Sequence, residues 1–281
     1  MRHRIIASSL ALVLAFGATS LGAQGPANDG VPEIGQVSRD SVWVPTPERM
    51  IRRLLQIADT TRSDLVMDLG SGDGRVPIYA ARHFGARAVG VELEKNLVRL
   101  SIASARAQGV GHLVKFLRQD LFDADLSRAN VIALYLSPGA MIRLRPQLLR
   151  LAPGTRIVSH QFTLEDWESD ETVRVEGRKG YLWVVPADIS GAWDVTAPDE
   201  KLQVRIEQKF QKLVTTGERA GKPVNVIGAQ LRGTEVRFTA FDRDGIARRY
   251  VGRIDGARMA GTASADRGAS LRWSARASKR R

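Results

Sequence analysis

The segment from Asp68 to Gly74 is the first in the sequence whose residue types and spacing could bind a ligand. It reads Asp-Leu-Gly-Ser-Gly-Asp-Gly. Glycine lets a backbone turn tightly and approach a ligand where a Cβ would block it. An apolar run precedes the segment and a helical pattern follows it, an order typical of the first unit of a nucleotide-binding α/β fold. We therefore expect a cofactor to be contacted by Asp68, Gly70, Ser71, Gly72, Asp73 and Gly74.

The spacing of the glycines and the two acids distinguishes between classes of cofactor. The dinucleotide fingerprint is G-x-G-x-x-G, whereas this segment reads G-x-G-x-G. Asp68 and Asp73 also place negative charge where a pyrophosphate would lie. The pattern therefore disfavours an NAD-dependent oxidoreductase. It favours a ligand that lacks phosphates and carries an amino group and a ribose.

Two further acids follow predicted strands. Glu92 ends the second apolar segment, at residues 88–93, and lies 20 residues after Gly72. An acid at that distance in such folds accepts hydrogen bonds from ribose hydroxyls, although a solvated strand-end glutamate is the alternative. Asp120 ends the third predicted strand, at residues 113–120, and Leu121 follows it.

The acidic glycine segment resembles motif I of the class I, seven-stranded S-adenosyl-L-methionine (SAM) methyltransferases. Residues 37 to 186 as a whole are similar to the small bacterial and mitochondrial protein-lysine methyltransferases. The mitochondrial members modify an ATP synthase subunit and the adenine nucleotide carrier. The motifs that carry this resemblance are V-P-T-P, D-L-G-S-G-D-G-R, G-V-E-L, Q-D-L-F, Y-L-S-P and V-S-H-Q-F.

The resemblance implies an enzyme that transfers a methyl group from SAM to an amine nitrogen, such as that of a protein lysine, without a metal. The substrate would be a protein or a small amine. Asp68 or Asp73 would attract the cofactor's amino group and Glu92 its ribose. Asp120 and Leu121 would contact its adenine.

Candidate catalytic residues lie at the ends of the fourth and fifth predicted strands, residues 130–138 and 156–162. Tyr135 and Ser137 stand where related enzymes hold the target nitrogen, but a packed tyrosine and a helix cap are equally compatible with the pattern. His160 is a candidate general base, with a structural histidine as the alternative.

The V-P-T-P segment is either a lid over the cofactor or a rigid helix entry. As a helix entry it would have Thr46 as N-cap and Pro47 as the first helical residue.

The order of elements predicts two domains. Alternating strands and helices over residues 37–187, closed by a hairpin at 172–175 and 181–185, predict a doubly wound, Rossmann-like α/β sheet. Short alternating segments over residues 188–277 predict a small antiparallel all-β domain of about six to eight strands. We expect its turns at Gly217, 221–223, Gly233, 244–245 and 255–256, and a basic tail at 278–281.

The N-terminus resembles a secretory signal. Residues 1–23 begin with Arg2 and Arg4, continue through a short apolar core and end in small residues, and 24–36 read as a flexible lead-in. An uncleaved membrane-proximal anchor is the alternative. The protein would then be periplasmic or secreted, or cytoplasmic if the leader is not functional. Because SAM is made in the cytoplasm, the second hypothesis is an exported, non-catalytic protein that keeps the fold as a binding module or scaffold.

Composition limits the chemistry and the partners. The 281 residues include no cysteine, which excludes disulfides, thiolate metal sites and a cysteine nucleophile. The net charge is +12, and residues 191–281 hold 19 Lys/Arg against 10 Asp/Glu. A basic C-terminal domain could contact an anionic membrane surface or an acidic protein. No arginine-rich run is interleaved with aromatic residues, so we expect no specific nucleic-acid partner.

Overall fold

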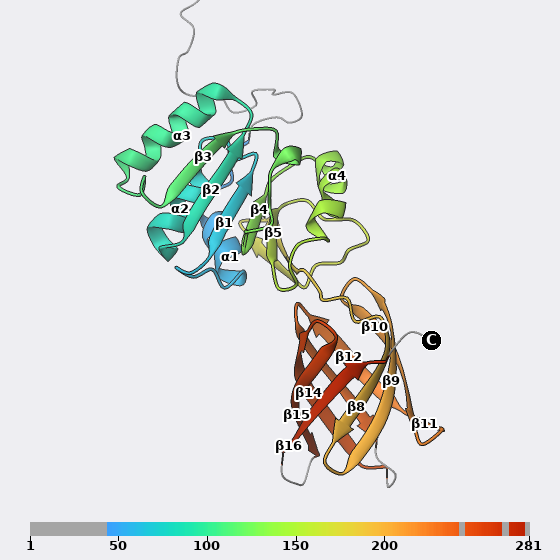
Figure 1. Ribbon diagram of the computed structural model, residues 1–281. Helices are drawn as coiled ribbons and strands as arrows, with labels where there is room; N and C mark the ends of the chain where they lie inside the picture. Colours follow the sequence, from blue (N-terminus) through green and yellow to red (C-terminus); the bar gives the residue numbers. More distant parts are fainter. Residues whose placement is uncertain (1–43, 242–244, 266–269, 279–281) are drawn as a thin grey trace, which may run out of the picture.

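The computed structural model describes residues 44–241, 245–265 and 270–278, which form an α/β domain and a β-barrel (Figure 1). The predicted leader, the lead-in, residues 37–43 and most of the basic tail lie outside the described residues. In the described part of the chain, no helix is long and apolar enough to cross a membrane.

The α/β domain is built on a seven-stranded sheet with the order β3-β2-β1-β4-β5-β7-β6. The first five strands are parallel, whereas β7 runs antiparallel to β5 and β6 antiparallel to β7. This arrangement confirms the predicted doubly wound sheet with a terminal hairpin. The strands are β1 (Leu65–Leu69), β2 (Arg87–Glu92), β3 (Val114–Arg118), β4 (Val131–Leu134), β5 (Arg156–His160), β6 (Glu171–Val175) and β7 (Arg178–Val184).

Helices cover both faces of this sheet. α1 packs with α2 on one face, against Val66, Ala133 and Val158, and α4 packs on the other face, against Ile132 and Ile157. Neighbouring residues of one strand thus enter opposite cores, as the two-residue period of a strand requires. The helices are α1 (Glu48–Ile57), α2 (Arg75–Phe84), α3 (Lys95–Ala107) and α4 (Pro138–Leu148).

The entry to α1 differs from its prediction. The helix begins at Glu48, Pro47 occupies the N-cap position, and no side chain caps the helix. The prediction that Thr46 is the N-cap is therefore wrong. The Thr46 hydroxyl instead lies 3.3 Å from His160 Nδ1, at the end of β5.

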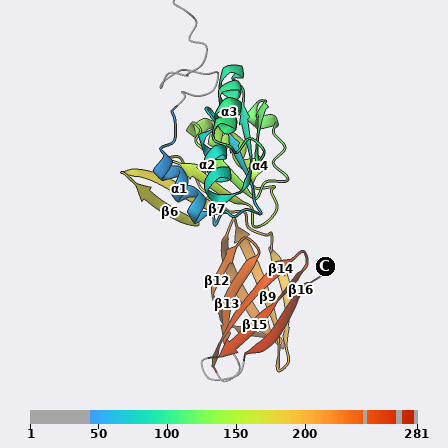
Figure 2. The same ribbon diagram turned by 90° about the vertical axis from the view of Figure 1, so that its left-hand side faces the viewer.

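The second domain is an antiparallel sheet of nine strands, ordered β11-β10-β9-β8-β16-β15-β14-β13-β12 and curled into a barrel (Figures 1 and 2). It confirms the predicted all-β domain, although the expected count of six to eight strands is too low. The strands are β8 (Gly191–Ala197), β9 (Glu200–Lys209), β10 (Lys212–Arg219), β11 (Lys222–Val224), β12 (Val226–Arg232), β13 (Glu235–Phe241), β14 (Ala247–Asp255), β15 (Arg258–Ala265) and β16 (Leu271–Ala277).

Gly217 shows how the barrel closes. It was expected in a turn, but it lies inside β10, so that prediction is wrong. A Cβ on Gly217 would come within 2.5 Å of Val226 Cγ2, and the neighbouring Thr215 hydroxyl donates a hydrogen bond to the Val226 carbonyl. Gly217 therefore lets β12 approach β10 where the two ends of the sheet meet.

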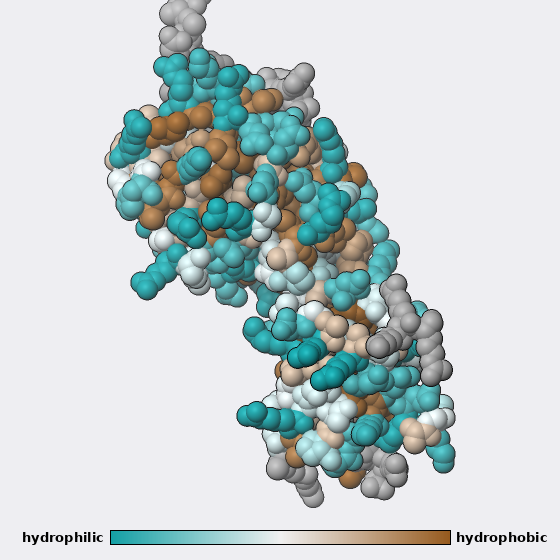
Figure 3. Space-filling view, in the orientation of Figure 1, coloured by the Kyte–Doolittle hydropathy of each residue, from teal (hydrophilic) through white to brown (hydrophobic). Residues whose placement is uncertain are grey.

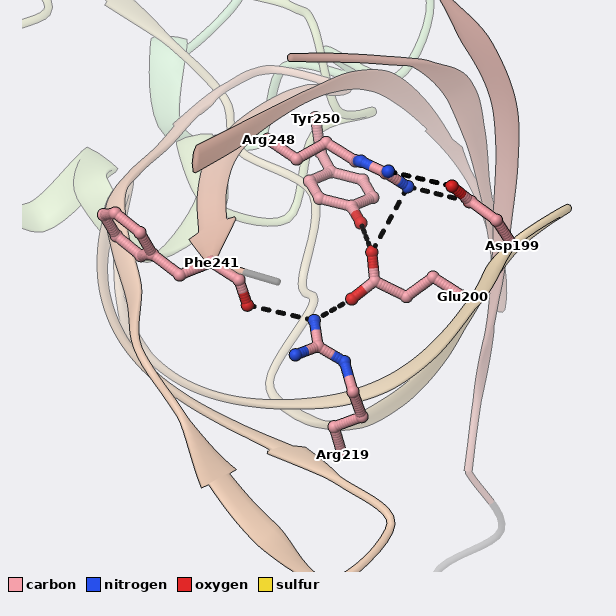
Figure 4. Close-up of polar contacts among 6 residues, drawn as sticks. All are labelled: Asp199, Glu200, Arg219, Phe241, Arg248 and Tyr250. Atoms are coloured by element: carbon pink, nitrogen blue, oxygen red, sulfur yellow. Dashed lines mark hydrogen bonds and ion pairs between the residues drawn. The ribbon is translucent and has the colours of Figure 1, made fainter. Parts of the chain in front are cut away.

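The interior of the barrel is filled rather than hollow. The rings of Phe238, Tyr250 and Trp273 pack against one another, with centroids 4.7 to 5.8 Å apart. Figure 4 shows a cluster of charged residues beside this core. Tyr250 and Arg248 donate to Glu200, Arg219 contacts the same carboxylate, and Arg248 also pairs with Asp199. Two carboxylates balance two guanidinium groups, so the cluster closes this end of the barrel without net charge.

The other end of the barrel packs on the α/β domain. In the β9–β10 turn, Phe210 stacks on Trp167 with ring centroids 5.8 Å apart. Gln211 accepts a hydrogen bond from the Trp167 indole and donates one to the Glu168 carbonyl. Gly233 approaches Gly154, just before β5 begins. The barrel therefore contacts the edge where β5 starts, opposite to the edge where the parallel strands end.

Candidate active site

A cleft lies at the carboxyl ends of the parallel strands, the usual ligand position in open α/β sheets. Asp68 ends β1, Glu92 ends β2 and Asp120 follows β3, and all three line it. Leu121, Gly70, Ser71, Gly72 and Asp73 line it as well. Gly74 and Ser137 are not among its lining residues.

The glycine turn has the backbone that its composition predicts. Gly70, Gly72 and Gly74 have φ of 76°, 54° and 77°, in the left-handed region that favours glycine. The amides of Gly70 and Ser71 donate to the Val91 carbonyl, which fixes the turn to β2. Gly74 has a different role from the other two, because a Cβ there would meet the Phe116 ring at 2.6 Å. It lets the start of α2 pack closely on β3.

Glu92 is held in place by backbone groups. Its Oε2 accepts a hydrogen bond from the Gly72 amide and its Oε1 accepts one from the Glu94 amide, both at 2.9 Å. Each carboxylate oxygen can accept a second bond. Glu92 can therefore receive two vicinal hydroxyl groups while the glycine turn fixes its orientation.

Asp73 and Asp68 differ in how their charge is compensated. Asp73 pairs with Arg75 at 2.6 Å, and Arg75 also donates to the Thr46 carbonyl. Asp68 is 6% exposed and receives no hydrogen bond from any described residue. Burial, followed by repulsion from Glu92 and Asp73, raises the pKa of Asp68 to about 8. A bound cation would offset the unfavourable energy of a buried, charged Asp68. Of the two acids, Asp68 is therefore the better candidate to bind an amino group.

The end of the cleft near Asp120 is also ordered. The Asp120 carboxylate accepts a hydrogen bond from the Phe122 amide at 2.9 Å and caps a 3₁₀ turn at Leu121–Asp123. This orients one carboxylate oxygen and leaves the other for a ligand. The Ser71 hydroxyl, also on the cleft, is buried and has no partner among the described residues.

The candidate catalytic residues separate into two groups. The Tyr135 ring packs on the His160 ring, with centroids 4.1 Å apart, and Tyr135 lines the cleft. His160 is 1% exposed, and burial followed by the positive charge of Arg178 lowers its pKa to about 4. Ser137 instead caps α4 by accepting a hydrogen bond from the Ala140 amide at 3.4 Å. Of the two alternatives for Ser137, the structure shows the helix cap.

Comparison with known proteins places this geometry in a family. Residues 68–171 match the sequence model of a family described as the ANTKMT methyltransferase domain. A protein-lysine N-methyltransferase of Saccharolobus islandicus (strain REY15A) is 38% identical over 149 residues, which are 51% of this chain and 92% of that protein. The chain belongs to this methyltransferase family. The methyltransferase therefore uses SAM as its cofactor.

Two other proteins show how far the likeness extends. The adenine nucleotide translocase lysine N-methyltransferase of Mus musculus is 33% identical over 45% of this chain, which spans 55% of that protein. A solved structure of an RNA methyltransferase from Salinibacter ruber, in complex with S-adenosyl-L-homocysteine, is 47% identical. The match covers 52% of this chain and 96% of the Salinibacter ruber chain, with a TM-score of 0.51.

The residues of the cleft fit SAM. The cofactor carries a positive sulfonium and an ammonium group, and Asp68 is a buried carboxylate without a partner among the described residues. Glu92 is oriented for a ribose diol, and Ser71 offers an unpartnered hydroxyl. Gly70 packs closely on Leu136, which also lines the cleft, and a Cβ on Gly70 would come within 3.0 Å of the Leu136 side chain.

Other features of the site were not anticipated from the sequence. Arg75 ties the glycine turn to Thr46, and Gln119 and Leu136 line the cleft. The motif D-G-R contains Arg75, but an arginine beside a glycine turn gives no sign of which acid it neutralises. Tyr135 and His160 were separate candidates, and their contact depends on the strand order β4–β5.

Proposed function

We propose that this methyltransferase transfers a methyl group from SAM to the ε-amine of a lysine in a protein. The observation that carries the proposal is the 38% identity to a protein-lysine N-methyltransferase over 92% of that protein. The cavity beside Tyr135 and His160, where a side-chain amine could enter, supports it.

In the proposed reaction the chain's own residues bind and orient. Glu92 would hold the ribose, Asp120 and Leu121 the adenine, and Asp68 the amino group. SAM supplies an electrophilic methyl group on a sulfonium. The amine must be neutral to attack, so the protein aligns it and removes water from around it. Tyr135, at the end of β4, is the candidate acceptor for a hydrogen bond from the amine.

Transfer of labelled methyl groups tests the substrate class. The protein is incubated with labelled SAM and a cell extract, and samples are then treated with protease or with ribonuclease. We expect protease, but not ribonuclease, to release the label. The Glu92→Ala variant should produce no label. Label released by ribonuclease would favour an RNA substrate, as the name of the Salinibacter ruber enzyme states for that protein. Failure of the protein to bind SAM would favour the scaffold alternative.

We also propose that the barrel contacts an anionic membrane surface. Four exposed arginines, Arg249, Arg258, Arg272 and Arg276, point outward from β14, β15 and β16. Arg258 and Arg276 stand directly opposite each other, and on their other sides they face Asp255 and Asp194, so positive charge at this end of the strands exceeds negative charge only when Arg249 and Arg272 are included. In Figure 3 the visible face of the barrel is mainly hydrophilic or intermediate in hydropathy, and hydrophobic residues gather on the α/β domain.

Sedimentation with vesicles tests the membrane contact. The barrel arginines predict binding to vesicles that contain phosphatidylglycerol and no binding to neutral phosphatidylcholine vesicles. Arg258→Glu combined with Arg276→Glu should abolish binding. Equal binding to both vesicle types would contradict the proposal, and capture of an acidic protein alone would favour the other partner class.

Export is a further proposal, supported by the signal-like residues 1–23. It places the catalytic domain outside the cytoplasm, so SAM would have to reach it there. Sequencing of the mature N-terminus after cell fractionation tests it. We expect a periplasmic or secreted protein that begins near Gln24, whereas an intact Met1 in the cytoplasmic fraction would contradict export.

A further inference from the structure

A second, smaller cavity adjoins the cofactor cleft. Its volume is about 300 Å³, and about 20 Å³ of it is open to a water-sized group, enough for one amine head. Thr46, Asp68, Val76 and Tyr135 line both spaces. The rest of the small cavity is apolar apart from His160, with Ile51, Leu54 and Leu55 of α1 on one side.

The strand order explains why polar groups meet here. Asp68, Tyr135 and His160 stand at the carboxyl ends of β1, β4 and β5, which are neighbours in the sheet. Each lies two residues after an apolar residue that packs toward α1, namely Val66, Ala133 and Val158. Alternate residues of a strand share a face, so the three side chains point to the α1 side.

His160 has one nitrogen engaged and one free. Nδ1 lies 3.3 Å from the Thr46 hydroxyl, whereas Nε2 is buried and has no hydrogen-bond partner within the described residues. In a neutral imidazole one nitrogen donates and the other accepts. When Nδ1 donates to Thr46, Nε2 presents a lone pair without a donor, and a buried acceptor of this kind requires one.

We propose that this cavity receives the amine of the substrate and that His160 Nε2 accepts a hydrogen bond from it. The proposal rests on the proposed function and deepens it, because it assigns the amine its site. The Thr46 hydroxyl and the Tyr135 ring fix the orientation of the imidazole. A primary amine fits in size and supplies the missing donor.

The surroundings favour the neutral amine that methyl transfer needs. The apolar α1 side chains disfavour an ammonium by desolvation, and Arg178 of β7 adds positive charge near His160. Burial lowers the pKa of His160, so its ring is neutral at pH 7 and accepts a hydrogen bond without carrying charge. Asp68 is the carboxylate that lines the cavity, and the cofactor's positive charge would offset it. The proton lost by the substrate ammonium goes to solvent.

Three variants of the full-length protein test the assignment. His160→Phe keeps a ring against Tyr135 but removes the acceptor, and His160→Gln restores an acceptor near the Nε2 position. His83→Phe is the matched control, because His83 is exposed on α2 and stacks on Tyr79. Methyl transfer to a lysine peptide should fall about tenfold in His160→Phe, recover in part in His160→Gln and remain unchanged in the control. SAM affinity by calorimetry should stay within about twofold of wild type in all three.

Nuclear magnetic resonance gives a readout independent of turnover. The sequence has four histidines, so ¹⁵N-histidine labelling resolves His160 by comparison with His160→Gln. Adding a lysine peptide together with S-adenosyl-L-homocysteine should shift its Nε2 signal, and a norleucine peptide should not. An unshifted signal, or wild-type transfer by folded His160→Phe, would overturn the site and leave the proposed function standing. A wild-type protein that binds SAM but methylates no lysine would overturn both.

Discussion

At the scale of single residues, the site depends on which charges are paired. Asp73 and Asp68 flank the same glycine turn. Arg75 neutralises Asp73, whereas no residue that the structure describes pairs with Asp68. The sequence predicted Asp68, Glu92 and Asp120 in one cleft because each follows a predicted strand. It did not distinguish Asp68 from Asp73, because the arginine that decides between them is near both in the chain.

Replacing Asp68 by Asn should stabilise the fold and impair the site. The pKa of Asp68 rises from 3.8 to about 8 on folding, so the folded state prefers the protonated carboxyl. Its contribution to stability is present below pH 3.8 and is lost as the pH rises toward 8. Asp68→Asn should therefore be more stable than wild type at pH 8, by about 5 kcal/mol, and nearly equal at pH 4. Thermal unfolding at both pH values measures this, and a constant difference would contradict it.

The same substitution should weaken SAM binding. An asparagine retains a carbonyl acceptor but lacks the charge that would meet the cofactor's ammonium and sulfonium groups. We expect SAM affinity at pH 8 to fall at least about tenfold, which corresponds to roughly 1.4 kcal/mol. Calorimetry measures the dissociation constant for SAM. Unchanged affinity in Asp68→Asn would mean that another residue contacts the amino group.

At the scale of elements, the alternation of inward-facing and outward-facing residues along each strand determined which strands and which shared faces could be predicted from the sequence. In β1, β4 and β5 the apolar residues predicted the strands, and the two-residue period places Asp68, Tyr135 and His160 on one face. The barrel was harder to predict. Gly217 resembles a turn residue, and only the closure of β12 on β10 explains a glycine inside a strand. The short β11 follows the turn at Gly221, within residues expected to be turn, which contributed to the low strand count.

The charged cluster that closes the far end of the barrel should contribute to stability. The side chains of Glu200, Arg219 and Arg248 are 9%, 10% and 14% exposed. Glu200→Ala leaves two poorly solvated guanidinium groups short of a partner and removes the acceptor of the Tyr250 hydroxyl. We expect a loss of about 3 kcal/mol in unfolding free energy.

Glu235→Ala is the matched control for this cluster, because Glu235 pairs with Arg253 on the exposed surface. Its effect should be below about 0.5 kcal/mol. Chemical denaturation compares the two variants. Equal effects would mean that burial of the Glu200 cluster does not matter for the barrel.

At the scale of the whole molecule, the barrel and the cofactor cleft lie at opposite edges of the sheet. The barrel holds the segment after β5 through Trp167, Phe210 and Gln211. This contact could not be predicted, since it joins residues 43 or more positions apart through an aromatic stack with no sequence signature. The family model matches residues 68–171, and the residues that we expect to contact SAM all lie in that range.

Phe210→Ala tests how far the two domains are independent. Loss of the stack on Trp167 should lower the unfolding temperature and, because fewer contacts then join the domains, should separate their unfolding transitions. SAM affinity should stay unchanged, since Phe210 is remote from the cleft. Calorimetric scans and SAM titrations provide the measurements. A large loss of SAM affinity would show instead that the barrel shapes the cofactor site.

We expect the cleft that Asp68, Glu92 and Asp120 line to hold SAM for methyl transfer to a protein lysine. The most direct measurement is mass spectrometry of peptides from the labelled protein band, after reaction with isotopically labelled SAM. Lysine side chains should carry added methyl groups, and these should be absent when Glu92→Ala replaces the wild type. Label confined to nucleic acid or to other side chains, or lysine methylation that persists in Glu92→Ala, would contradict it.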